Sequence, residues 1–245
     1  MDLAAIVQLG DCEAIGGGWL QQPVNAWSSL AFGVVGVAIV AGARSTAGRE
    51  QTVRIIFGVL LIATGAGSFL FHGPQPTPGE FVHDLTFLAA LWFLIVANVT
   101  GASGETTGHT ETTGHTETVG HTEAHWTGVL AVIAGIAGIA ALLAWDGGVT
   151  NILTALLAMG LIGSDVLLWT RAAPSPGWYG LAISSLLIGI GLFLAGRTGS
   201  PLCDPDGLAQ AHAGWHVFAA VFLGAYFFAT VPARTMSAPT EAARP

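Results

Sequence analysis

The sequence predicts an all-α membrane protein: a seven-transmembrane helix bundle with its amino terminus outside and its carboxyl terminus in the cytoplasm. Of the 245 residues, 52% are hydrophobic and only 9% are charged, whereas soluble domains carry roughly 25% charged residues. Seven apolar stretches have about the 20 residues that a helix needs to cross a bilayer. Strands of a membrane barrel would be about half as long and would alternate in polarity. The predicted spans are residues 26–43, 53–72, 81–99, 126–145, 149–170, 178–195 and 209–231.

The arginines predict the orientation, because the chain contains no lysine. Six of the seven arginines fall on one side of a seven-span bundle, and only Arg197 falls on the other. Positive residues stay in the cytoplasm, so we expect a multi-pass protein of the cell membrane with an external amino terminus. The six that share a side are Arg44, Arg49, Arg54, Arg171, Arg234 and Arg244.

The predicted organisation is a single integral membrane domain over residues 1–245. Residues 1–25 lack the basic start and apolar core of a signal peptide, so we expect an external amino-terminal segment of the mature protein. Residues 104–125 repeat a hexamer of Gly, His, Thr and Glu. We interpret them as a low-complexity cytoplasmic linker, although histidine-rich tracts can also bind metal. Residues 233–245 are expected to be a disordered tail.

Composition also excludes some functions. The net charge of −8 is loop charge, and no basic patch is present to meet nucleic-acid phosphates. A retinal protein needs a lysine for its Schiff base, which this chain lacks. A metal transporter remains an alternative but is less favoured, because it would place its ligands near the membrane midplane, whereas the histidines discussed below gather at one edge.

Polar residues with chemical potential occur at the predicted outer ends of three spans. Ser68 and His72 stand four residues apart at the end of the second, so they share a helix face. Asp84 lies in the first turn of the third, and His212 and His216 open the seventh. In a seven-helix bundle these side chains can converge.

These residues fit a catalytic metal site. Histidines at i and i+4 on one helix can bind one metal ion, and His72 supplies a third ligand. Three protein ligands plus a water is the arrangement of catalytic zinc, whose bound water has a pKa near about 7. Asp84 could take a proton from that water, and Ser68 could orient it or donate to an oxyanion.

Each residue has a structural interpretation as well. A single histidine at a membrane edge is often an interfacial or hydrogen-bonded residue, and a serine at a helix end is often a cap. An aspartate in a first helical turn is favourable through the helix dipole alone. Only their joint placement on one side of the membrane favours the metal site.

The combined pattern resembles the alkaline ceramidase family, which belongs to the seven-helix membrane hydrolases that also include the adiponectin receptors. The resemblance lies in GAGSFLFHG, in the Asp twelve residues after its His, in HAGWH on the last span and in the opening DCEAIGGGWLQQPVNAWSSLAF. It implies zinc bound by His72, His212 and His216, with Ser68 and Asp84 as the catalytic polar pair. The implied reaction is hydrolysis of a lipid amide drawn from the bilayer, at a site toward the extracytoplasmic face.

The resemblance also implies a disulfide between Cys12 and Cys203, and the arginine count places both cysteines outside, where disulfides persist. Eukaryotic members of the family hold calcium with an acidic amino-terminal cluster. Here Asp11 stands one position late and Gln22 replaces a later glutamate, so we expect no tight calcium site. Glu13 is expected to pair locally or cap, and Asn25 to cap the first span.

Two other polar residues lie in the predicted spans. His83 points about 100° away from Asp84 around a helix, which predicts a peripheral role. Asp165 lies inside the fifth span, where a carboxylate usually faces a partner such as Ser164 or a backbone carbonyl. Two alternative functions remain: a zinc-containing seven-helix receptor or sensor, and a metal transporter. A receptor like the adiponectin receptors would lie in the membrane in the orientation opposite to the one that the arginines predict. The sequence sets neither the lipid substrate nor the oligomeric state.

Overall fold

The fold is known from a computed structural model that describes residues 10–104, 117–169 and 175–231. In this part of the chain, seven helices are long and apolar enough to cross a membrane. Each coincides with one predicted span, which confirms the all-α bundle, and the length and composition of the seven helices suit a multi-pass membrane protein. Which end faces the cytoplasm stays a prediction. The helices are α2 (Pro23–Gly42), α3 (Gly48–His72), α4 (Gly79–Gly104), α5 (Glu117–Trp145), α6 (Thr150–Trp169), α7 (Pro176–Ala195) and α8 (Ala211–Thr230).

The largest difference from the predicted boundaries concerns the repeat segment. α5 begins at Glu117, nine residues before the predicted start, because a helix continues beyond the apolar stretch where no proline interrupts it. Residues 105–116 of the predicted linker and the predicted tail at 233–245 lie outside the described residues.

The start of α2 is set by proline and by a distant carboxylate. Pro23 occupies the first helical position, where its missing N–H is not needed. Glu13 then accepts hydrogen bonds from the backbone N–H groups of Val24 and Asn25, both at 2.8 Å. The expectation that Asn25 caps this span is therefore wrong: it lies inside the first turn, fully buried, and Glu13 is the cap.

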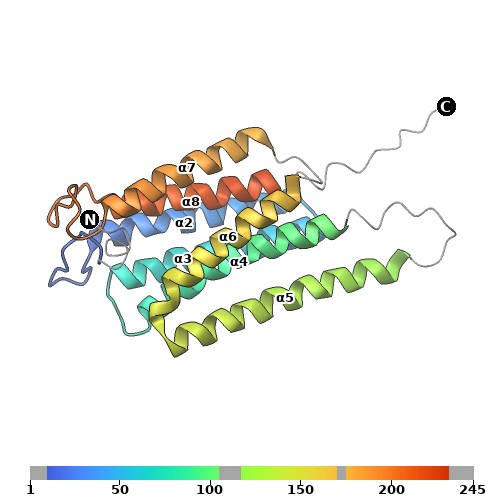
Figure 1. The fold of residues 1–245 in the computed structure, drawn as a ribbon, viewed down its shortest axis with the longest axis horizontal. Coiled ribbons are helices and arrows are strands. Elements are labelled where there is room, and N and C mark those ends of the chain that lie inside the picture. Colours follow the sequence, from blue (N-terminus) through green and yellow to red (C-terminus); the bar gives the residue numbers. More distant parts are fainter. Residues whose placement is uncertain (1–9, 105–116, 170–174, 232–245) are drawn as a thin grey trace.

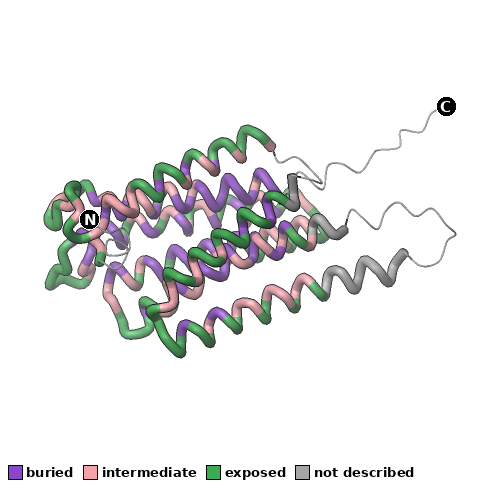
Figure 2. Tube along the Cα trace, viewed as in Figure 1, coloured by how far each residue is buried: buried purple, intermediate pink, exposed green. Residues whose placement is uncertain are grey.

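α8 is the centre of the bundle. In Figure 1 the helices run alongside one another, and α8 lies next to α7 and α2. Of its apolar stretch 67% is buried, against 11% for those of α5 and α6, and the purple of Figure 2 follows it along most of its length. α8 packs on α2 and α7, while α4 contacts α3, α5 and α6. Residues that begin α8 are thereby held in the interior.

Two features lock α3 into this core. The Phe57 ring stacks between the rings of Phe93 and Phe227, with centroids 5.7 and 4.8 Å away. Towards the other end of α3, its backbone approaches α2 so closely that a Cβ on Gly65 would lie 2.8 Å from the backbone nitrogen of Gly33. Small residues permit such close approach between membrane helices.

One end of the bundle collects the amino-terminal segment, defined here as residues 10–22, and the α7–α8 connection, residues 196–210 (Figure 1). Cys12 and Cys203 join these two segments, with their sulfur atoms at bonding distance, 2.07 Å. The backbone N–H of Cys12 also donates to Gly196 O at 2.8 Å. The pairing implied by the family resemblance is therefore present, and it holds the amino-terminal segment across the start of α8.

Candidate metal centre

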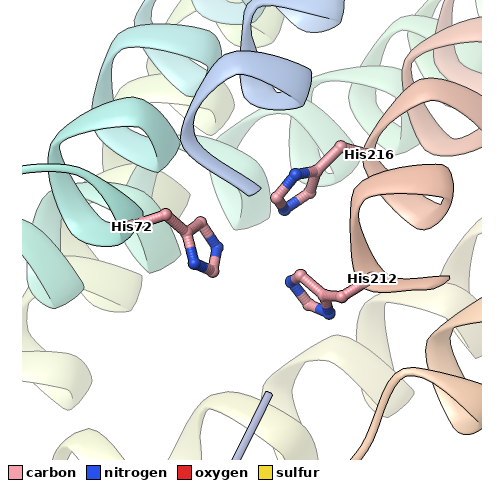
Figure 3. Close-up of side chains that lie close together, drawn as sticks. All are labelled: His72, His212 and His216. Carbon is pink, nitrogen blue, oxygen red and sulfur yellow. The ribbon is translucent and has the colours of Figure 1, made fainter. Parts of the chain in front are cut away.

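Three histidines from two helices form a buried cluster at this end of the bundle. His72 is the last residue of α3, and His212 and His216 occupy the first two turns of α8. One ring nitrogen from each lies within 4.8 Å of the other two. Figure 3 shows the rings turned toward a common space. The structure thus brings together the three side chains that the i, i+4 spacing and His72 predicted, and they could hold one metal ion.

The tautomer of His72 follows from Gln22. The Gln22 amide Nε2 donates to the backbone oxygen of Glu13 at 2.8 Å, so its Oε1 faces His72 Nδ1, also at 2.8 Å. An amide oxygen only accepts, so His72 Nδ1 carries the proton. Its Nε2 is buried, has a free lone pair and has no hydrogen-bond partner.

His216 is arranged in the same way by Ser28. The Ser28 hydroxyl donates to Asn25 O at 2.9 Å, so it accepts from the Nδ1–H of His216, also at 2.9 Å. His216 Nε2 is likewise buried without a partner. Leaving a buried polar atom unsatisfied costs about 1–3 kcal/mol, and two such nitrogens facing one space are what a metal ion would satisfy.

His212 faces a carboxylate instead. Its Nδ1 makes no hydrogen bond of good geometry, but Asp11 Oδ1 lies 3.2 Å away, within ion-pair range. This contact leaves Nε2 of His212 for the common space. The neutral imidazole is the usual form of a histidine metal ligand, and three of them leave one position open in a tetrahedral site. The donor set therefore fits zinc.

Ser68 is buried one turn before His72 but pairs with another serine. Its hydroxyl lies 2.8 Å from that of Ser29, which in turn donates to Asn25 O at 2.8 Å and lies 3.4 Å from His216 Nδ1. Ser68 thus reaches the histidine cluster through Ser29.

Asp84 lies beside the cluster rather than in it. One of its oxygens is 2.8 Å from His83 Nδ1, and the other accepts from the Thr150 hydroxyl at 2.5 Å. His83 lies closer to the cluster than its predicted peripheral role suggests, because its ring centroid is 5.9 Å from that of His72. Neighbouring residues differ by 100° around a helix, so a broad inward face of α4 holds both His83 and Asp84. The adjacent His and Asp in GEFVHDLTF were the sequence signal for this pair.

The residues at the positions of the family's calcium cluster each have a different partner in this structure. Glu13 caps α2, Gln22 contacts His72, and Asp11 pairs with Arg197, whose Nη1 is 2.9 Å from Oδ1. Burial raises the pKa of the Asp11 carboxyl above its ordinary value, and the Arg197 guanidinium opposes that shift. The sequence analysis missed that Asp11 and Gln22 of the amino-terminal segment, together with Ser28 of α2, contact the histidines.

A cavity of about 590 Å³ opens among α4, α6, α7 and α8. Its lining is almost entirely apolar, and on α8 it extends from Trp215, the neighbour of His216, to Tyr226. Residues that represent the four helices are Phe87, Leu91, Ile162, Ile183, Trp215 and Phe222. The volume is within the range of small-molecule sites, about 300–1,000 Å³.

Asp165 places a carboxylate in the lining of this cavity. It accepts hydrogen bonds from the hydroxyls of Tyr226 and, at 3.0 Å, Tyr179. Asn98 extends the network by donating to Tyr226 at 2.7 Å and to Ser164 at 2.9 Å. Asp165 thus faces partners, as predicted, but they are two tyrosines from α7 and α8, 14 and 61 residues along the chain, rather than the suggested Ser164 or backbone carbonyl.

Comparisons of the chain with family models, with curated proteins and with solved structures found no significant match. The site is therefore interpreted from its own chemistry.

Proposed function

We propose that this chain is a zinc-dependent membrane hydrolase that cleaves the amide bond of ceramide or a related N-acyl lipid. The observation that carries the proposal is the buried cluster of His72, His212 and His216. Two of the three have their Nδ1 proton fixed by a neighbour and their Nε2 directed, without a partner, into a shared space. Such preparation is characteristic of metal ligands.

A zinc ion at this position supplies a Lewis acid and a water whose pKa is lowered toward about 7. We assign uptake of the proton of that water to Asp84 together with His83, because the two are hydrogen-bonded and His83 borders His72. With the ion bound, the water oxygen would add to the amide carbon, the C–N bond would break, and Asp84 and His83 would return the proton to the leaving nitrogen. The products are a fatty acid and a long-chain amine.

Ser68 is assigned to the substrate carbonyl oxygen. To donate there, its hydroxyl turns away from Ser29, which keeps its own hydrogen bond to Asn25 O. One oriented donor to a developing oxyanion typically contributes about 10²–10³ in rate.

The apolar cavity supports a lipid substrate. It is lined by residues of four helices, among them Trp215 in the second turn of α8, so it offers apolar space for a hydrocarbon chain on the helix that carries His212 and His216. A lipid amide of the bilayer has such a hydrocarbon chain, joined to the polar amide group that would be cleaved.

The location of the arginines supports an extracytoplasmic site. Arg44, Arg49 and Arg54 lie around the α2–α3 connection, at the opposite end of α3 from His72. Since positive residues stay in the cytoplasm, the histidine end would face outward.

The test combines metal analysis of the purified protein with hydrolysis of a panel of N-acyl lipids, including ceramide. We expect about one zinc per chain and an amine product, with both lost in His216→Ala. Asp84→Asn should keep zinc but lose about 10²–10⁴ in rate, as expected for loss of general base catalysis. Glu80→Gln, an exposed carboxylate one turn earlier on α4, is the matched control and should leave both unchanged.

Each other outcome has a meaning. Activity that survives complete removal of metal would refute the mechanism. Zinc without hydrolysis of any lipid amide would favour the receptor or sensor alternative, and zinc transported across vesicles would favour the transporter.

A further inference from the structure

Asp11 is the charged residue of the amino-terminal segment that faces the histidine cluster. Its side chain is only 11% exposed. Oδ1 lies 3.2 Å from His212 Nδ1, and Oδ2 lies 3.6 Å from His72 Nδ1. The carboxylate therefore contacts the rings of two candidate ligands, one on α3 and one on α8.

Both contacts are made on the Nδ1 side of the rings. Because His72 and His212 direct Nε2 toward the common space, Asp11 is placed to act behind the ligands rather than as a ligand itself. A carboxylate in that place accepts the Nδ1 proton, fixes the ring orientation and increases the basicity of the ligating nitrogen. Gln22 does this for His72 and Ser28 does it for His216. Asp11 stands in the corresponding place behind His212, with Oδ1 at ion-pair distance from Nδ1, 3.2 Å, although the contact lacks the geometry of a hydrogen bond.

The segment that carries Asp11 is held by several independent contacts. The adjacent Cys12 is joined to Cys203, and the Thr198 hydroxyl lies 2.9 Å from the backbone oxygens of both Gly10 and Asp11. Asp11 also forms a backbone bridge with Arg197. A carboxylate held in this way can orient a ring with little loss of side-chain entropy.

Arg197 fixes the carboxylate itself. Its Nη1 donates to Asp11 Oδ1 at 2.9 Å, and its guanidinium lies over the Phe193 ring, 4.8 Å from the centroid. The arginine balances the buried negative charge, and its bond to Oδ1 fixes the oxygen that faces His212.

We propose that Asp11 is a positioning residue of the metal centre, whose carboxylate, held by Arg197, orients His212 and contacts His72 so that both present Nε2 to the ion. The proposal rests on the metal site proposed above. It assigns the amino-terminal segment a direct effect on metal affinity, beyond that of a structural clamp.

The test is the zinc affinity of Asp11→Asn in the full-length protein, measured by competition with a chromophoric chelator. Asparagine can still accept from Arg197, so the segment should stay in place, but it is a weaker acceptor for an imidazole N–H. We expect a loss of about 10–100-fold in affinity and a changed visible absorption spectrum of the Co²⁺-substituted protein. Asp206→Asn, an exposed carboxylate in the α7–α8 connection, is the control and should match the wild type.

The outcomes are separable. Formation of the Cys12–Cys203 disulfide in Asp11→Asn, checked by mass spectrometry, verifies that the segment is in place. An Asp11→Asn protein with the disulfide and with the affinity and Co²⁺ spectrum of Asp206→Asn would overturn the proposal. If the wild-type protein binds neither zinc nor Co²⁺, the metal site itself is refuted, and the role of Asp11 with it.

Discussion

Replacing Gly65 by alanine is expected to loosen the α2–α3 contact and the metal centre together. A Cβ at this position would lie 2.8 Å from Gly33 N and 3.2 Å from Ser29 O. Both are backbone atoms, so no side-chain rotation relieves the overlap. Ordinary contact begins at 3.4 Å, so the helices must separate by about 0.6 Å to relieve the overlap. Such backbone shifts are the usual response to an overpacked core.

The displacement acts near the site. The Ser29–Ser68 hydrogen bond, now 2.8 Å, would lengthen by a similar amount, beyond the usual range for O–H···O bonds. Overpacking costs about 1–3 kcal/mol, from which the helix-propensity gain of about 0.5–1 kcal/mol on replacing Gly is subtracted. We therefore expect a loss of about 1–2 kcal/mol in the free energy of unfolding and weaker zinc binding.

The facing residue provides the control. A Cβ on Gly33 would meet nothing within 4 Å, so Gly33→Ala makes the same chemical change in the same helix contact without overlap. It should be neutral or stabilising by up to about 1 kcal/mol. Thermal unfolding and zinc competition in one detergent measure both variants. If Gly65→Ala behaves like Gly33→Ala, the close contact does not limit the packing, and the reasoning is refuted.

Two further variants test the packing and the polar network inside the bundle. Phe57→Ala removes the ring stacked between Phe93 and Phe227 and should lower the free energy of unfolding by about 3 kcal/mol. This is the low end for such truncations, because lipid is as apolar as the core. An unchanged thermal midpoint would contradict the prediction. Tyr226→Phe removes a hydroxyl donor to Asp165 and should destabilise by about 1–3 kcal/mol. For the second variant, the matched control is Phe222→Tyr, which adds a hydroxyl to a neighbouring ring of the same cavity; equal midpoints for the two would show that the Asp165 contact contributes nothing.

The helices could be predicted from sequence because each is defined by local composition. About 20 apolar residues must form a helix in lipid, where backbone groups have no other partner. The i, i+4 spacing of His212 and His216 is likewise local, and it places both rings on one face. His72 could be added only on the assumption that the end of α3 lies beside the start of α8.

The partners behind the ligands could not be predicted, because they depend on how separate segments meet. Gln22 and Asp11 were considered for calcium from their positions in the chain, but the fold directs them to His72 and His212. The angle of His83 on an isolated helix predicts a peripheral role, yet its ring lies beside that of His72 at the end of α3.

By itself, the sequence determined that seven helices form and which ends carry histidines, since both follow from residue type and spacing along the chain. Only the tertiary structure decided which ring nitrogen of each histidine faces the common space and which oxygen lies behind it. Those contacts join residues 50 to 201 positions apart, and their geometry is set by the packing of α2, α3 and α8 and by the disulfide that fixes the amino-terminal segment across them.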